Sequence, residues 1–157
     1  MRFEHLVEIN DPLNPLIEPL STERVWHGLM YRVDDPTVFL PGLESCSILS
    51  RAEGRVEREL HFGQASVRDV VTFEPFEWVR FESSATADHA GGRLTIRLEQ
   101  PETDHLFLRF TYETTLSEAE GGSEGVKVSE FVKAAYRESD LDTVRVIRLI
   151  ATTGYPH

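Results

Sequence analysis

Hydrophobic and polar positions alternate along most of this chain, and the alternation predicts a sheet of seven strands. In the N-terminal strand, Phe3, His5, Val7 and Ile9 share one face. Six later segments have the same period of two, at residues 44–51, 55–62, 65–74, 77–84, 93–99 and 105–115. The breaks between them are short and often contain Gly or Pro, and such connections join antiparallel neighbours. The pattern therefore predicts one antiparallel sheet.

Two regions have helical periodicity instead. Residues 21–34 begin with a Ser-Thr cap, and Asp35-Pro36 ends that segment before a second short helical turn at 36–40. Residues 126–157 predict one long helix after a flexible acidic loop at 117–125. At about 1.5 Å per residue, only this last helix is long enough to cover one face of the sheet.

The apolar stripe of the long helix is interrupted in its middle. Steps of three and four residues place on one face Val128, Phe131, Val132, Ala135, Ser139, Asp142, Thr143, Val146, Leu149 and Ile150. Ser139, Asp142 and Thr143 are polar, and burying an unpaired polar group costs about 1–3 kcal/mol. The helix either packs at both ends and lines a cavity at its centre, or it kinks or overhangs and leaves its centre in water.

Hairpin geometry places further polar residues on the inner face of the sheet. A two-residue turn at Gly63-Gln64 sets Arg58 directly opposite Asp69 among apolar neighbours. The pair is either a structural ion pair, which we favour, or a polar anchor for a ligand. Tyr112 also faces inward, and its hydroxyl needs a partner that a cavity or ligand could supply.

The strand at residues 77–84 allows two registers. One turns Trp78 and Arg80 inward, and a slip by one residue turns Val79 and Phe81 inward instead. We favour the slipped register because Val79 and Phe81 are the apolar pair.

Composition limits the function. The 157 residues fit a single domain, 1–157, and the net charge of -11 disfavours a nucleic-acid partner. No apolar run approaches the ~20 residues that insert across a membrane, and the N-terminus has no signal-peptide pattern. Cys46 is the only cysteine, which excludes an internal disulfide and fits the cytoplasm. The oligomeric state stays open.

Signatures of known catalytic and cofactor sites are absent from the sequence. The histidines have no metal-ligand spacing, and there is no phosphate-binding loop, dinucleotide turn or serine nucleophile elbow. We therefore expect no metal and no cofactor. His5 fits a core histidine with one hydrogen bond, and less well a cavity-lining acid or base.

Short motifs from nearly the whole chain carry a family resemblance. They are FEH (3–5), EIN (8–10), WHGL (26–29), FLPGL (39–43), ATADHAGG (85–92), LFLRFTY (106–112), FVKAAY (131–136) and DLDT (140–143). With them the chain resembles the AtaL-like family of the START-like (SRPBCC, birch-pollen-allergen-like) helix-grip superfamily. The resemblance implies an α+β fold, a seven-stranded curved antiparallel sheet wrapped around a long C-terminal helix, with two short helices after the first strand. It also implies small apolar or amphipathic ligands between sheet and helix, but no catalytic set for this branch.

Two functions follow as hypotheses. The first is binding of a small hydrophobic metabolite by Arg58, Asp69, Tyr112, Tyr136, Ser139, Asp142 and Thr143. The second is a cyclase or dehydratase that acts on a polyketide-like or aromatic molecule in the same cavity, with His5 and Asp142 as acid and base. A weaker third hypothesis is an interaction module whose interior is filled by side chains.

Overall fold

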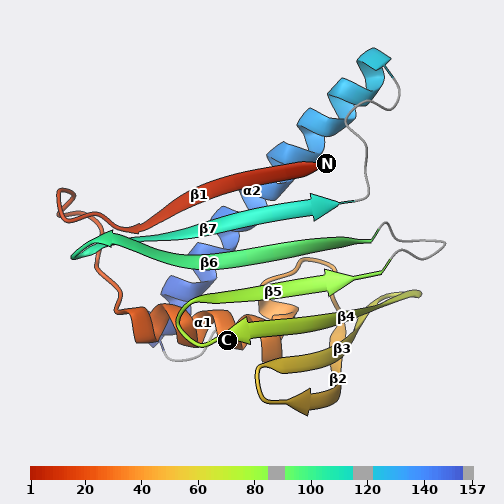
Figure 1. Cartoon of the computed structure of the whole chain (residues 1–157), viewed down its shortest axis with the longest axis horizontal. Coiled ribbons are helices and arrows are strands. Elements are labelled where there is room, and N and C mark those ends of the chain that lie inside the picture. The colour runs from red at the N-terminus through yellow and green to blue at the C-terminus, as the bar shows by residue number, and fades with distance from the viewer. Residues whose placement is uncertain (85–90, 115–121, 154–157) are drawn as a thin grey trace.

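A seven-stranded antiparallel sheet lies against one long helix (Figure 1). The computed structural model describes residues 1–84, 91–114 and 122–153, and for residues 122–129 the backbone alone. The strands are β1 (Arg2–Asn10), β2 (Ser45–Ala52), β3 (Arg55–Phe62), β4 (Ala65–Glu74), β5 (Trp78–Ser83), β6 (Gly92–Glu102) and β7 (His105–Thr114). Their order across the sheet is β1-β7-β6-β5-β4-β3-β2, so the consecutive strands β1 and β2 lie at opposite edges. The predicted antiparallel sheet is confirmed.

The helical segments are α1 (Thr22–Asp34), the 3-10 turn η1 (Pro36–Val38) and α2 (Gly122–Thr153). Ser21 caps α1 by accepting a hydrogen bond from the backbone N–H of Arg24 at 3.2 Å. The α+β order matches the prediction, with the second short helix reduced to η1. Because α2 begins at Gly122, the end of the predicted acidic loop is helical. The rest of that loop, and most of the predicted turn after β5, lie outside the described residues.

Gly28 lets α1 pack closely on α2. A Cβ at this position would lie 2.8 Å from Cγ1 of Ile147, which is closer than side chains normally approach. The two helices thus meet behind the sheet in Figure 1, and both pack into one hydrophobic core with the strands. We call the sheet face that they cover the inner face. This packing brings the last turn of α1 to the inner face.

Turn geometry sets the strand registers. The two-residue turn between β3 and β4 pairs Arg58 with Asp69, as predicted. Between β4 and β5 the chain turns through three residues, with Phe76 at φ 64°, and Phe73 pairs with Val79. This confirms the slipped register, in which Val79 and Phe81 are buried.

The inner face of α2 is rotated by about one residue from the predicted stripe, and Thr143, Val146 and Ile150 belong to both. Its buried positions are Asp140, Thr143, Val144, Val146, Ile147 and Ile150. Phe131, in contrast, is 76% exposed and Leu149 is 42% exposed. The side chain of Val128 lies outside the described residues. Both stripes have helical spacing, so the packing partners on α1 and the sheet select between them.

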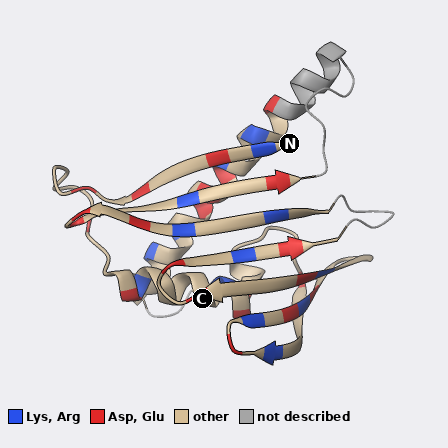
Figure 2. Cartoon of the chain, in the orientation of Figure 1, with Lys and Arg blue, Asp and Glu red and all other residues tan. Residues whose placement is uncertain are grey.

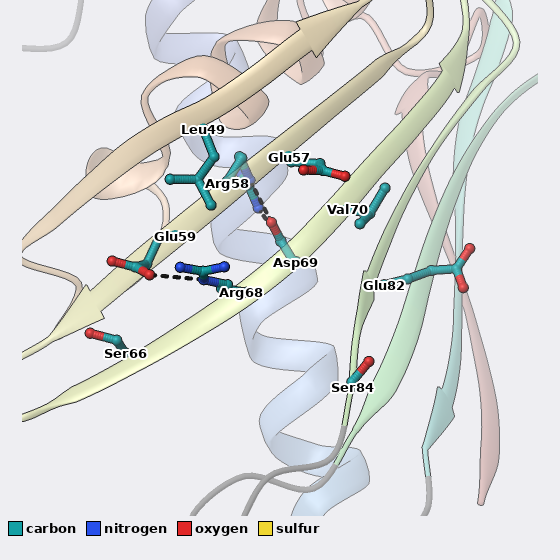
Figure 3. A pocket seen from close by; sticks show the side chains of 10 residues that line it. All are labelled: Leu49, Glu57, Arg58, Glu59, Ser66, Arg68, Asp69, Val70, Glu82 and Ser84. Atoms are coloured by element: carbon teal, nitrogen blue, oxygen red, sulfur yellow. Dashed lines mark hydrogen bonds and ion pairs between the residues drawn. The ribbon is translucent and has the colours of Figure 1, made fainter.

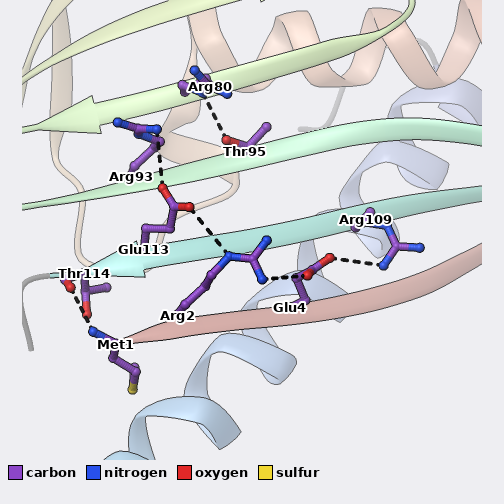
Figure 4. Close-up of polar contacts among 9 residues, drawn as sticks. All are labelled: Met1, Arg2, Glu4, Arg80, Arg93, Thr95, Arg109, Glu113 and Thr114. Carbon is purple, nitrogen blue, oxygen red and sulfur yellow. Dashed lines mark hydrogen bonds and ion pairs between the residues drawn. The ribbon is translucent and has the colours of Figure 1, made fainter. Parts of the chain in front are cut away.

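Basic and acidic residues both occur along the strands (Figure 2), and several of them pair on the outer face of the sheet. Figure 4 shows a ladder across β1 and β7, in which Arg2 and Arg109 both reach Glu4 at 3.0–3.1 Å. Further along, Arg93 lies 3.4 Å from Glu113. These pairs are partly or largely exposed to solvent, and such pairs stabilise a fold only weakly. Among the described helices, none combines the length and the apolar character that a membrane span requires.

Candidate functional site

A buried carboxylate on α2 connects the helix to two neighbouring strands. Asp140 is 1% exposed, its Oδ1 accepts a hydrogen bond from the hydroxyl of Tyr112, and its Oδ2 lies 3.0 Å from Nδ1 of His5. Tyr112 is on β7 and His5 is on the neighbouring strand β1. Phe3, two residues before His5, pairs with Tyr112, so the side chains of His5 and Tyr112 lie on the same, inner face of the sheet. One carboxylate therefore joins a phenol and an imidazole, which we call the Asp140 cluster.

Aromatic rings surround the Asp140 cluster. Tyr136, one turn before Asp140 on α2, stacks on Tyr112 with ring centroids 3.8 Å apart and planes 4° from parallel. The ring centre of Phe3 lies 6.2 Å from that of Tyr136, and the guanidinium of Arg137 lies 5.0 Å from the centre of the Phe3 ring. The polar atoms of the cluster are thus set in an apolar wall.

Burial raises the pKa values of Asp140 and Tyr112 in the cluster. It raises the pKa of Asp140 to about 6, although hydrogen bonds from Tyr112 and His5 and the charge of Arg32 act in the opposite direction. Burial, the negative charge of Asp140 and the hydrogen bond to it raise the pKa of Tyr112. Near neutral pH, Asp140 can therefore either give or take a proton, while Tyr112 stays a hydrogen-bond donor.

A second buried polar group lies at the end of α1. Arg32 is 6% exposed, and its guanidinium lies over the ring of Phe81, 4.6 Å from the ring centre. Nε of Arg32 has no hydrogen-bond partner within the described part of the chain. Burial, and to a lesser extent the charge of Arg58, lowers the pKa of Arg32, and the negative charges of Asp140 and Asp69 partly oppose that shift. Arg32 is thus within electrostatic reach of the Asp140 cluster.

Arg58 and Asp69 form a buried clamp between the sheet and α1 (Figure 3). Arg58 Nε donates to Asp69 Oδ1 at 2.9 Å, and its second guanidinium nitrogen donates to Asp69 Oδ2. The remaining nitrogen donates to the carbonyl oxygens of Val33 at 2.9 Å and Arg32 at 3.3 Å, at the end of α1. A cation is favourable at these carbonyls, so the geometry supports a structural role for the pair.

A pocket of about 590 Å³ lies over the same strands (Figure 3). Apart from the clamp, its lining includes Glu57, Glu59, Arg68 and Glu82, which alternate along the strands with inward residues and so face outward. Arg68 and Glu59 pair with each other at 3.0 Å. The pocket is open, and charged side chains of both signs are more numerous in its lining than is usual for small-molecule sites.

The predicted ligand residues fall into two groups. Tyr112 and Thr143 are buried on the inner side as predicted, and Tyr136 and Ser139 are partly buried. The placement of Asp142 was wrong, because its side chain is 47% exposed and lies 3.5 Å from Arg145. The inward carboxylate is Asp140, two positions earlier.

Sequence reasoning missed both Asp140 and Arg32. Asp140 lies four residues after Tyr136, so a stripe started at Tyr136 would have found it. Arg32 lies three residues after Leu29 and seven after Val25, which puts it on the buried face of α1. A charged residue in the last turn of a helix usually faces solvent, so the sequence pattern alone did not identify Arg32 as buried.

One cluster could hold a cation by its chemistry. Glu8, Asp11 and His105 bring their ligand atoms within 4.8 Å of one another, near the ends of β1 and β7. His105 Nε2 lies 2.7 Å from Glu8, so an ion pair accounts for that contact without a metal. The cluster lies at the edge of the sheet and is partly solvent-exposed, unlike the buried Asp140 cluster.

The family model described as "AtaL: Acetylaranotin biosynthesis cluster protein L" matches residues 7–154. No curated protein matches the chain significantly.

Solved structures share the fold at low sequence identity. The Zhui aromatase/cyclase from Streptomyces sp. R1128 is 18% identical, with a TM-score of 0.61 over 96% of this chain and 94% of that one. The di-domain ARO/CYC StfQ from the steffimycin biosynthetic pathway is 10% identical, with a TM-score of 0.70 over 97% of this chain and 50% of that one. The protein TTHA0849 from Thermus thermophilus is 16% identical, with a TM-score of 0.63 over 99% and 98%. These likenesses confirm the helix-grip architecture.

Proposed function

The chain belongs to the AtaL family, and from this premise we propose that it binds a small, mainly apolar molecule. The molecule lies between the inner face of the sheet and α2, with a polar end at the Asp140 cluster. The observation that carries the proposal is the 1% exposed carboxyl of Asp140 in an aromatic wall. A fold that needed only a core would gain more from an apolar residue there, because desolvating a carboxylate is costly.

Two further observations support binding at this place. Thr143, one turn after Asp140 on the inner side of α2, is a small polar residue that is 2% exposed. The Zhui protein, which shares the fold, is named an aromatase/cyclase, and StfQ is named an ARO/CYC of the steffimycin biosynthetic pathway. The shared fold favours a site for a small organic ligand over a packed interaction module, and Thr143 supplies a small polar side chain next to Asp140.

The test begins with native mass spectrometry of freshly purified protein, which detects a bound molecule by its excess mass. Titration with the neutral fluorescent probe N-phenyl-1-naphthylamine then measures binding directly. We expect Thr143→Trp to weaken probe binding at least about 10-fold, because the indole occupies the ligand's space. Leu141→Trp is the matched control, since Leu141 is 55% exposed on the outer side of the same helix turn.

The outcomes separate clearly. Loss of binding in Thr143→Trp with binding retained in Leu141→Trp supports the site. A wild-type protein that carries no excess mass and binds no probe contradicts the proposed function.

A second candidate is an acid/base enzyme of the cyclase or dehydratase type. It is favoured by the pKa of Asp140 near 6, combined with hydrogen bonds to Tyr112 and His5. In an aldol cyclisation, the Asp140 carboxylate takes a proton from the carbon beside a ketone. The enolate carbon then attacks a second carbonyl, and Tyr112 stabilises the oxygen that becomes negative. The proton that Asp140 took up passes to that oxygen, so Asp140 returns to its carboxylate form and the step needs no oxidant or reductant.

The first half of this reaction can be measured without the natural substrate. Deuterium exchange into the methyl group of acetophenone, followed by NMR, reports proton removal beside a ketone. We expect Asp140→Asn to lower the catalysed exchange about 10²-fold or more. Exchange that persists in Asp140→Asn, or that wild type does not accelerate, removes the enzyme candidate and leaves the binding function intact.

A further inference from the structure

We propose that Arg32 is the receptor for an anionic oxygen of the bound molecule. The ligand class is thus a planar, mainly aromatic compound with one acidic oxygen group, such as a carboxylate or a phenolate. This inference rests on the proposed binding function and specifies the ligand that the site selects.

The first observation is that Arg32 is buried and unsatisfied. It is 6% exposed, its Nε lacks an acceptor, and the described residues make no ion pair with its guanidinium. A buried guanidinium is normally paired, because desolvation of an isolated charge costs several kcal/mol. The ring of Phe81 compensates only in part, through a contact on one face of the guanidinium.

The second observation is that the nearby carboxylates are already engaged. Both oxygens of Asp69 accept hydrogen bonds from Arg58. Both oxygens of Asp140 are in contact with Tyr112 and His5. Arg32 is close enough to both carboxylates to be influenced by their charge, yet it makes a hydrogen bond to neither. Nε of Arg32 therefore keeps a donor that neither of these carboxylates engages.

The third observation is that Arg32 is held in place from behind. Arg58 donates to the backbone carbonyl of Arg32, and the guanidinium of Arg58 lies 5.2 Å from the centre of the same Phe81 ring. A binding group that is fixed before the ligand arrives loses less conformational entropy on binding. Arg58 and Asp69 thus act as positioning residues for Arg32.

Aromatic side chains define the rest of the ligand class. Phe81 lies beneath Arg32, and the stacked rings of Tyr112 and Tyr136 border the Asp140 cluster. Flat apolar surfaces of this kind suit a planar ring system, since aromatic groups associate in offset stacks or edge-to-face pairs. The polar group of such a ligand would meet Arg32 while its rings meet the aromatic wall.

The test uses two probes that share a ring skeleton. 8-Anilinonaphthalene-1-sulfonate carries a negative sulfonate, and N-phenyl-1-naphthylamine lacks it. We expect Arg32→Met to weaken binding of the sulfonate probe about 10- to 100-fold, which is the effect of losing a charged hydrogen bond. Binding of the neutral probe should change by less than about twofold, because the methionine side chain preserves most of the apolar volume.

Arg80→Met is the matched control. Arg80 also lies over an aromatic ring, 5.3 Å from the centre of Trp78, but it neighbours Phe81 on β5 and so faces outward. This variant should bind both probes as wild type does. Thermal melting checks that each variant is folded, and Arg32→Lys, which keeps the charge, should retain part of the preference for the sulfonate probe.

The outcomes distinguish this inference from the proposed function. If wild type binds the neutral probe as tightly as the sulfonate probe, or if Arg32→Met weakens both probes equally, Arg32 is not an anion receptor although the site binds small molecules. If wild type binds neither probe, the binding site itself is contradicted. Selective loss of the sulfonate probe in Arg32→Met supports the inference.

Discussion

Two buried arginines lie over the ring of Phe81, and they differ in how their polar atoms are satisfied. Arg58 donates to both oxygens of Asp69 and to two carbonyl oxygens of α1. Arg32 has an unpartnered Nε and no hydrogen bond from its side chain to the described residues. The comparison teaches that burial alone does not reveal a role. Complete pairing indicates a structural residue, whereas a buried group without a partner needs a separate explanation, which for Arg32 is the proposed ligand.

The largest effect should come from breaking the paired arginine. Asp69→Ala leaves the guanidinium of Arg58 buried without its carboxylate, which should lower the free energy of unfolding by about 3–5 kcal/mol. Urea unfolding measures this change in the free energy of unfolding. Glu59→Ala is the control on the neighbouring strand, because it removes the exposed pair with Arg68 and should cost less than about 1 kcal/mol. Equal effects of the two substitutions would show that the clamp is not structural.

The next effect is a pH dependence that comes from Asp140. Its pKa of about 6 lies above the ~3.9 of an unfolded aspartate, so the folded protein binds this proton more tightly than the unfolded chain. The resulting stability is present below about pH 4 and is lost as the pH rises through about 6, a difference of roughly 2–3 kcal/mol.

Asp140→Asn should remove this contribution. His5, Tyr112 and Arg32 also influence Asp140, so unfolding in urea is best compared between the variant and wild type across pH 4 to 7. Asp142→Asn is the matched control, because Asp142 is 47% exposed on the same helix and should leave the profile unchanged. Parallel profiles for wild type and Asp140→Asn would contradict the raised pKa.

The smallest effect should come from removing the unpaired arginine. Arg32→Met replaces an uncompensated buried charge by an apolar chain of similar length, so the free energy of unfolding should stay within about 1 kcal/mol or rise. Urea unfolding in the absence of any ligand measures this change. A loss of several kcal/mol would mean that Arg32, like Arg58, is a structural residue.

The sequence predicted the sheet better than the site, for a physical reason. Strand register follows from local rules, so the turn at Gly63-Gln64 was enough to place Arg58 opposite Asp69. The side chains that face the interior from a helix depend on its rotation, which distant partners decide. For α2 one such partner is Gly28 of α1, against which Ile147 packs. The resulting rotation of α2 turns Asp140 toward the interior in place of Asp142. Local patterns carry no information about such a choice.

The sequence also could not predict that Nε of Arg32 lacks a hydrogen-bond partner. Whether Arg32 has a partner depends on how α1 packs against the hairpin of β3 and β4, which is distant from α1 in the chain. The α1 pattern of Val25, Leu29 and Val33 identifies the buried face, and Arg32 lies on it. It does not show that Arg58 has already taken the nearest carboxylate.

The most direct test follows the two arginines in one NMR experiment. Arginine Nε–H signals of ¹⁵N-labelled protein are recorded before and after addition of 8-anilinonaphthalene-1-sulfonate, with Arg32→Met used to assign the Arg32 signal. We predict that the Arg32 signal moves as the sulfonate supplies an acceptor, while the Arg58 signal stays in place. Probe binding that leaves Arg32 unmoved, or that moves Arg58 instead, would contradict the assignment of Arg32 as the ligand receptor.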